Sequence, residues 1–112
     1  MTNRPKIRGT AAESAVVHYL KGRGWPYAER RALSGGKDRG DVAGVAGVVI
    51  EVKDCKTLTF GPWLNEAETE KANDHAAVGA VWAKRRGTTD PGKWFVLMTG
   101  EQFTALLKEA GY

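Results

Sequence analysis

The chain of 112 residues has little cysteine, little histidine and no long hydrophobic run. Its single cysteine, Cys55, excludes an internal disulfide and is typical of a reducing compartment, so we expect a cytoplasmic protein. One cysteine and two widely separated histidines argue against a zinc site. No apolar stretch approaches the ~20 residues of a membrane span, and residues 1–6 lack the apolar segment of a secretory signal.

Charge is plentiful and uneven. Hydrophobic residues make up 42% of the chain and charged residues 27%, which is typical of one globular domain over residues 1–112. The net charge of +4 permits a polyanionic partner, although a basic surface that only aids solubility explains it equally well. Basic residues gather in two segments, 21–39 and 84–86.

Hydrophobic periodicity predicts an α/β fold with the element order α-β-β-β-α-β-β-α, in which helices flank a central mixed sheet. A capping box from Thr10 to Glu13 marks the start of the first helix, and Thr99 caps the last one, whose Phe103, Leu106 and Leu107 should face the core. Trp63, Trp82 and Trp94 are expected inside and His18 and His75 outside. The expected segments are a helix at 11–21, a strand at 27–33, a hairpin within 40–53, a helix at 63–77, strands at 78–83 and 94–99, and a final helix.

The most informative segment is the hairpin from Gly40 to Lys53. From Val48 onward its side chains alternate, so that Glu51 and Lys53 share the face opposite to the apolar one. A two-residue turn would place Asp41 among valines, opposite Val52. A three-residue turn at 45–47 instead pairs Val42 with Ile50 and sets Asp41 opposite Glu51. Because the second register keeps a carboxylate out of the core, we predict the three-residue turn.

Two carboxylates on directly opposed strand positions predict a metal site. Their Cβ atoms would lie roughly 4.5–5.5 Å apart, a distance at which the charges repel unless a cation lies between them. Mg²⁺ binds one or two carboxylates and substrate phosphate, so we expect it at Asp41, Glu51 and the backbone carbonyl of Val52. Lys53, two residues on, would orient the attacking water, lower its pKa or offset charge on a phosphate. These parts suit phosphodiester hydrolysis, with a glycine-rich basic loop at 34–40 beside the first acid.

The spacing Asp41-(x9)-Glu51-Val52-Lys53 resembles the signature of the PD-(D/E)xK nuclease superfamily, without the proline before the first acid. More narrowly, the chain resembles Holliday junction resolvases of the archaeal and phage type. The helix glutamate Glu13, the Ser-Gly-Gly loop and the Gly40-Asp41-Val42 step fall in that family's order. The later segment 84–98 is similar to resolvases of actinobacterial phages.

This resemblance implies a restriction-endonuclease-like core and a Mg²⁺-dependent endonuclease, with Mn²⁺ as a substitute. It implies a homodimer that nicks four-way DNA junctions, in the host cytoplasm if a phage encodes it. In the family the helix glutamate joins the metal site, so Glu13 is either catalytic or only a helix cap. Asp38 would replace Asp41 if the loop register differs. The expected DNA contacts are Arg30, Arg31, Ser34, Lys37, Arg39, Lys56, Arg85 and Arg86, of which Ser34 is equally well a plain loop serine.

Other interpretations of the same residues stay open. The chain could be a restriction-like or repair endonuclease with another DNA target, or a basic DNA-binding module without catalysis. It could also be a protein-interaction domain whose basic surface is incidental. Glu66 and Glu70 on the second helix either approach the site or only offset the helix dipole.

Overall fold

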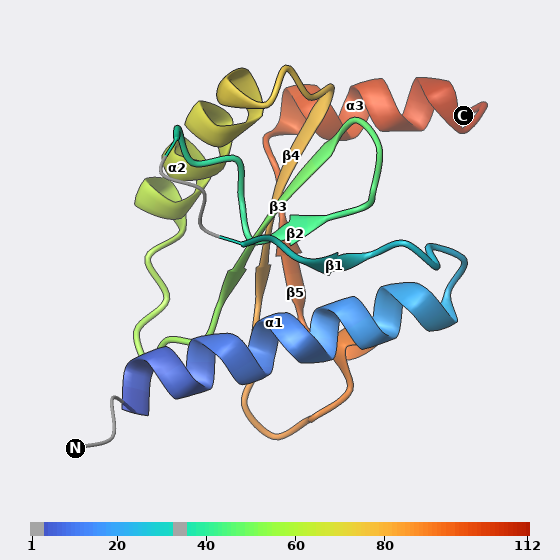
Figure 1. Ribbon diagram of the computed structural model, residues 1–112. Coiled ribbons are helices and arrows are strands. Elements are labelled where there is room, and N and C mark those ends of the chain that lie inside the picture. Colours follow the sequence, from blue (N-terminus) through green and yellow to red (C-terminus); the bar gives the residue numbers. More distant parts are fainter. Residues whose placement is uncertain (1–3, 33–35) are drawn as a thin grey trace.

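The computed structural model describes residues 4–32 and 36–112. Its element order confirms the predicted α-β-β-β-α-β-β-α succession and the α/β class, with one short 3₁₀ turn added (Figure 1). The elements are α1 (Arg4–Gly22), β1 (Glu29–Arg30), β2 (Val42–Ala43), β3 (Val48–Lys53), α2 (Phe60–Asn73), β4 (Val78–Ala83), η1 (Pro91–Lys93), β5 (Phe95–Leu97) and α3 (Gly100–Glu109).

The main sheet has the strand order β3-β4-β5 and is mixed, as predicted. Strands β3 and β4 are parallel and are joined by α2, the crossover helix that a parallel pair requires. Strand β5 pairs antiparallel with β4. Strands β1 and β2 form a separate antiparallel pair. Among the described residues, β3 therefore has no ladder partner on its outer edge.

Helices cover both faces of the main sheet, so the fold has three layers (Figure 1). On one face, Val16 and Leu20 of α1 pack against Ile50 and Val52 of β3 and against Trp94. On the other face, the cluster comprises Trp63 and Ala67 of α2 with Val81 and Ala83 of β4. Residues Glu51 and Lys53 point toward this second face, because successive strand side chains alternate. The predicted alternation of β3 is confirmed.

The hairpin prediction is wrong. Strand β2 pairs with β1 rather than with β3, and the Val48 N–H donates to the Val45 carbonyl at 3.2 Å, which closes a two-residue turn. The segment before β2 instead crosses the outer edge of β3, where the Asp41 N–H donates to the Ile50 carbonyl at 2.9 Å. Because this segment crosses the edge without forming a ladder, a two-residue turn does not force the carboxylate into the apolar core.

Helix α1 begins at Arg4, so Thr10 lies inside the helix and the predicted capping box is wrong. Nothing before Thr10 prevents a helix, since Pro5 lies in the first turn and an interior Gly9 costs only about 1 kcal/mol. Helix α2 likewise begins at Phe60, three residues early, and ends at Asn73. Strand β1 covers only 29–30 of the predicted 27–33, and residue 33 lies outside the described ranges.

The C-terminal helix begins as predicted and packs differently. The Thr99 hydroxyl accepts a hydrogen bond from the Gln102 N–H, which confirms the cap. Phe103 is 54% exposed, and Gln102 is buried in its place, where its side chain bonds both backbone groups of Gly79. The prediction is therefore wrong for Phe103, while Leu106 and Leu107 are half-buried.

The other burial predictions are largely confirmed. Trp63 and Trp94 are buried and Trp82 is half-buried, while His18 and His75 are exposed. Within the described ranges, no helix is both long and apolar enough to cross a bilayer.

Candidate metal centre and its basic surroundings

The outer edge of β3 places Asp41 beside the signature residues. The Val52 N–H donates to Asp41 Oδ2 at 2.7 Å, so a carboxylate oxygen occupies the place of a strand carbonyl. The Lys53 carbonyl accepts from Lys84 N–H at 2.8 Å and so faces β4. Because peptide groups alternate along a strand, the Val52 carbonyl faces the other way, toward the Asp41 edge. The expected carbonyl ligand therefore lies on the same edge as Asp41.

The close approach of this segment depends on Gly40, which has a φ of +92°. A Cβ atom there would lie 2.9 Å from Val49 Cγ1 and 3.1 Å from the Ile50 carbonyl oxygen. Any other residue would push the segment away from β3. The glycine in the Gly40-Asp41 step thus sets the position of the carboxylate.

Glu51 and Lys53 lie together on the α2 side of β3. Glu51 is 4% exposed, and its Oε2 lies 3.2 Å from Lys53 Nζ. Lys53 Nζ also donates to Glu66 Oε1 at 3.0 Å. The structure therefore brings Asp41, Glu51 and Lys53 close together, but not through the hairpin register from which their meeting was predicted.

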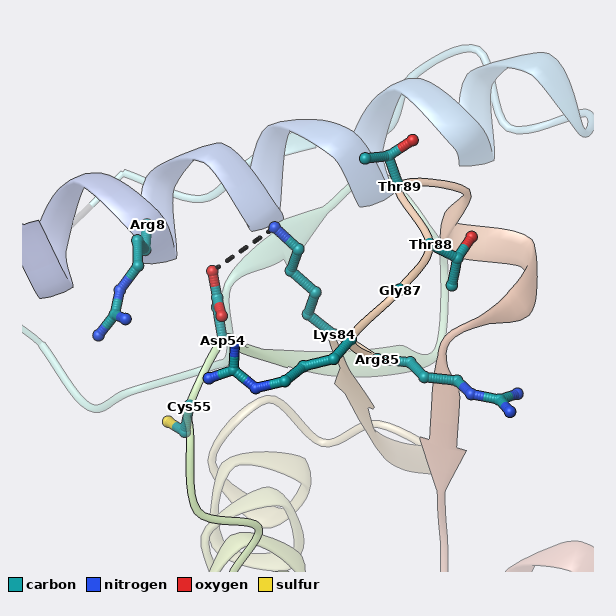
Figure 2. A pocket seen from close by; sticks show the side chains of 9 residues that line it. Arg8, Asp54, Cys55, Lys84, Arg85, Gly87, Thr88 and Thr89 are labelled. Carbon is teal, nitrogen blue, oxygen red and sulfur yellow. Dashed lines mark ion pairs between the residues drawn. The ribbon is translucent and has the colours of Figure 1, made fainter.

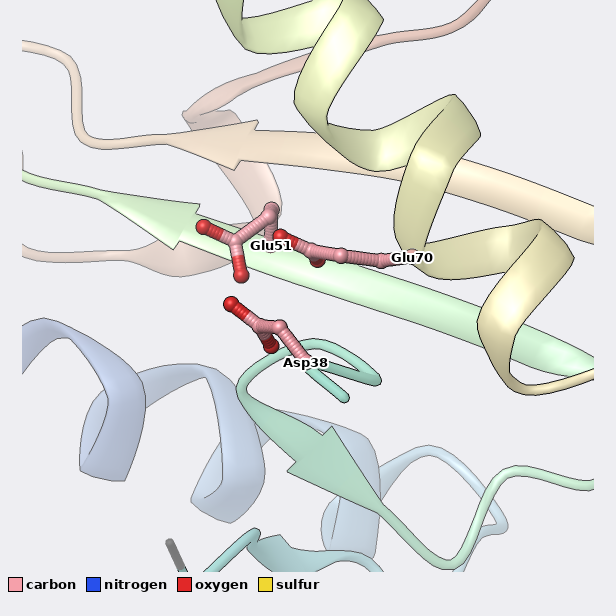
Figure 3. Close-up of side chains that lie close together, drawn as sticks. All are labelled: Asp38, Glu51 and Glu70. Carbon is pink, nitrogen blue, oxygen red and sulfur yellow. The ribbon is translucent and has the colours of Figure 1, made fainter. Parts of the chain in front are cut away.

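Two further acids join Glu51 (Figure 3). Glu70 reaches it from α2 and Asp38 from the loop before β2, and one oxygen from each of the three carboxyl groups lies within 4.8 Å of the others. The proposed dipole role of Glu66 and Glu70 was thus the wrong alternative. The sequence held a signal for Glu70, since Trp63, Ala67 and Glu70 recur at helical spacing and share the buried face of α2.

Burial is the main cause that raises the pKa of Glu51, Glu70 and Asp41. Burial, contact with Glu66 and the charges of Asp41 and Glu70 raise the pKa of Glu51 to about 11. Burial and the charges of Asp38, Glu66 and Asp41 raise the pKa of Glu70 to about 8. Burial also raises the pKa of Asp41, helped by the charge of Glu13 and opposed by the Val52 hydrogen bond. The centre therefore holds protons unless a cation replaces them.

The pKa of Lys53 is raised as well, and for a lysine this favours the charged form. Burial lowers its pKa, but the carboxylates of Glu66 and Glu51 outweigh that effect and raise the pKa above the ordinary value for lysine. Lys53 is thus a fixed positive charge beside Glu51.

The residues present fit a hard divalent cation. Glu51 Oε1 and both oxygens of Glu70 are buried without a hydrogen-bond partner among the described residues. Buried carboxylate oxygens without partners are costly and are normally compensated by a donor, a proton or a metal. An all-oxygen set is the one that Mg²⁺ and Mn²⁺ prefer.

Glu13 lies close enough to the centre for its charge to raise the pKa of Asp41. Its Oε2 accepts a hydrogen bond from Arg30 Nε at 3.0 Å, and the side chain is 19% exposed. Since Glu13 is not at the start of α1, its predicted role as a helix cap is wrong, and a place at the edge of the metal centre stays a prediction.

The predicted DNA contacts fall into two groups. Arg30 is paired with Glu13, while Arg31 and Arg39 lie 3.8 Å and 4.0 Å from the two carboxylate oxygens of Asp74. Part of their charge is therefore neutralised within the chain. The second group comprises the exposed residues Lys37, Lys56, Arg85 and Arg86. Ser34 lies outside the described residues.

Two members of the second group, Arg85 and Arg86, line a basic pocket of about 500 Å³ beneath the first turns of α1 (Figure 2). Arg8 enters it from α1, and Lys84, Arg85 and Arg86 line it from the segment after β4. Asp54, the one acid in the lining, lies 3.9 Å from Lys84 Nζ. Arg8 was missed by the sequence analysis, because only the tertiary fold brings it to residues 84–86.

No protein-family model, curated protein or solved structure matched this chain. The function therefore has to be argued from the residues and their arrangement.

Proposed function

We propose that the chain is a metal-dependent endonuclease of the PD-(D/E)xK type that resolves four-way DNA junctions. The observation that carries the proposal is the meeting of Asp41, Glu51 and Lys53 at one edge of β3, with the Val52 N–H bound to Asp41 at 2.7 Å. Acids and lysines on a strand are common, but here Asp41 joins Glu51 and Lys53 from a separate segment, and all three are partly or fully buried. The element order is the one expected for a restriction-endonuclease-like core.

In this proposal Asp41, Glu51 and the Val52 carbonyl hold Mg²⁺, for which Mn²⁺ can substitute. When bound, the metal polarises the scissile phosphate and makes a water more acidic. Lys53 stays protonated because its neighbours raise its pKa. Of its three predicted roles, we therefore favour the one in which Lys53 offsets negative charge on the phosphate. Glu66 holds the Lys53 ammonium in place through its 3.0 Å hydrogen bond.

DNA would be held by the exposed basic residues on both sides of the centre. Lys37 and Lys56 flank it in sequence, and the basic pocket offers Arg8, Arg85 and Arg86 for a backbone phosphate. Such contacts position the duplex without reading its bases, which suits an enzyme that recognises branched shape. Paired nicks in a junction require two centres, which a two-fold homodimer provides.

The proposal is tested by cleavage of synthetic four-way junctions and of linear duplex of the same sequence, with and without Mg²⁺ or Mn²⁺. We expect metal-dependent cleavage of junctions only, and none by Asp41→Asn or Glu51→Gln. Equal rates on junction and duplex would instead favour the restriction-like or repair endonuclease. DNA binding without any cleavage above these variants would leave only the non-catalytic DNA-binding module, and binding that does not weaken as salt rises would favour the protein-interaction domain.

A further inference from the structure

Three carboxyl groups from three separate segments meet on the α2 side of β3 (Figure 3). Asp38 precedes β2, Glu51 lies in β3 and Glu70 lies in α2. This set differs from the predicted ligand set, because it contains neither Asp41 nor Glu13. One oxygen of Asp41 accepts a hydrogen bond from the Val52 amide, and one oxygen of Glu13 accepts from Arg30. In the proposed set, Asp38 Oδ1 accepts from the Gly40 amide, whereas Glu70 has no such partner among the described residues.

Glu70 is the member that needs explanation. It is 1% exposed, and within the described part of the chain neither of its carboxylate oxygens has a hydrogen-bond partner. Its side chain points at Glu51, whose Oε1 is also buried and without a partner (Figure 3). Isolated buried carboxylates are strongly unfavourable. A structural acid in this position would be expected to face a lysine, an arginine or backbone amides, and Glu70 faces further acids.

The size of the cluster fits one cation. Opposite oxygens around an octahedral Mg²⁺ are about 4.2 Å apart, and around Ca²⁺ about 4.8 Å apart. Because one oxygen from each acid lies within 4.8 Å of the others, small side-chain movements suffice to bring all three into contact with an ion. Asp38 is exposed, so the cluster is open to solvent on that side.

We propose that Asp38, Glu51 and Glu70 form a second divalent-cation subsite, which shares Glu51 with the Asp41–Glu51 site. The inference deepens the proposed endonuclease function and rests on it for the first site. Two-metal nucleases place their ions roughly 3.5–4 Å apart, so that both the attacking and the leaving oxygen of the phosphate are stabilised. A shared carboxylate is a direct way to hold two ions that close.

The test is a Mn²⁺ titration of the full chain without DNA, followed by the electron paramagnetic resonance signal of the free ion. We expect two Mn²⁺ per protomer in the wild type. Glu70→Gln and Asp38→Asn should each weaken one of the two sites by at least about tenfold. Glu109→Gln, an exposed acid on α3, is the matched charge control and should retain both sites. Glu70→Gln preserves side-chain shape, and Asp38→Asn changes an exposed residue, so the two variants together separate binding from folding.

A wild type that binds a single Mn²⁺ overturns the proposal, whichever variant removes that ion. Two sites with unchanged affinities in both Glu70→Gln and Asp38→Asn overturn it equally. If either result accompanies metal-dependent junction cleavage, the second subsite fails and the endonuclease proposal stands. If the wild type binds no Mn²⁺ and cleaves no DNA, both fail.

Discussion

Asp41 Oδ2 accepts a hydrogen bond from the Val52 N–H, with a nitrogen–oxygen distance of 2.7 Å. This bond holds the segment before β2 against the outer edge of β3. The same residue is therefore both a structural link and the first expected metal ligand. These two roles can be separated by substitution.

Asp41→Asn retains a side-chain oxygen that can accept from the Val52 amide, whereas Asp41→Ala leaves that amide without its partner. We expect Asp41→Ala to lower the free energy of unfolding by about 1–3 kcal/mol, and Asp41→Asn to lower it by less. Both should reduce metal-dependent cleavage by at least about a hundredfold, because several kcal/mol of charge stabilisation are lost. Urea denaturation and junction cleavage measure the two effects. Equal stability of the two variants would contradict the structural role.

The stability of the metal-free protein should fall as pH rises from about 5 to 8. The folded state raises the pKa of Glu70 to about 8 and that of Glu51 to about 11, whereas both are near 4.3 in an unfolded chain. Between these values the folded state binds more protons than the unfolded state, so the stabilisation present at low pH is lost as pH rises. We expect this loss in EDTA, where no metal ion offsets the charge of the deprotonated acids.

The control for this pH dependence is Glu70→Gln, which removes one of the two titrating groups and should flatten the slope. Added Mg²⁺ should reverse the trend, since it binds the deprotonated folded state. Thermal unfolding monitored by circular dichroism at several pH values provides the measurement. A stability that increases over this range in EDTA would be incompatible with buried, proton-holding acids.

Lys53→Met should abolish cleavage, because the lysine acts on the phosphate at the metal centre. It should leave DNA affinity within about twofold, because only one of many positively charged side chains is lost. The raised pKa of Lys53 also predicts that the wild-type rate shows no change from lysine titration between pH 6 and 9. Single-turnover cleavage and fluorescence anisotropy with labelled junctions separate rate from binding. A rate that rises with deprotonation of a group lost in Lys53→Met would indicate a general base instead.

The basic pocket should contribute binding and not chemistry. Arg85→Ala and Arg86→Ala are each expected to weaken junction binding and to reduce the slope of log K against log salt by about 1, as for one lost phosphate contact. Lys108→Ala, exposed in the last turn of α3, carries the same charge change and should leave the slope unaltered. An equal effect from all three variants would mean that only net charge matters.

Local patterns were sufficient to predict the order of elements, whereas the meeting of Asp41, Glu51 and Lys53 was predicted from a hairpin register that the structure does not have. The β3 alternation was visible because strand side chains repeat every two residues, and the Thr99 cap because it is a local hydrogen bond. The pairing of β2 with β1 was not predictable in this way, because register depends on contacts between distant segments. Arg8 was missed for the same reason. For Glu70 both alternatives stayed open, although its helical spacing with Trp63 and Ala67 already placed it on a buried face.

The last prediction concerns Gly40, which holds the Asp41 segment against β3. A Cβ atom at this position would lie 2.9 Å from Val49 Cγ1, and the backbone there has a φ of +92°. Gly40→Ala therefore combines a steric clash with backbone strain. Gly47 has a φ of +76° and nothing within 4 Å of its Cβ position, so Gly47→Ala measures strain alone, about 1–3 kcal/mol. We expect Gly40→Ala to be the more destabilising variant and to lose cleavage as well, because it moves the Asp41 carboxylate. If both variants lose the same stability and both retain full cleavage, the contact between Gly40 and β3 does not position the site.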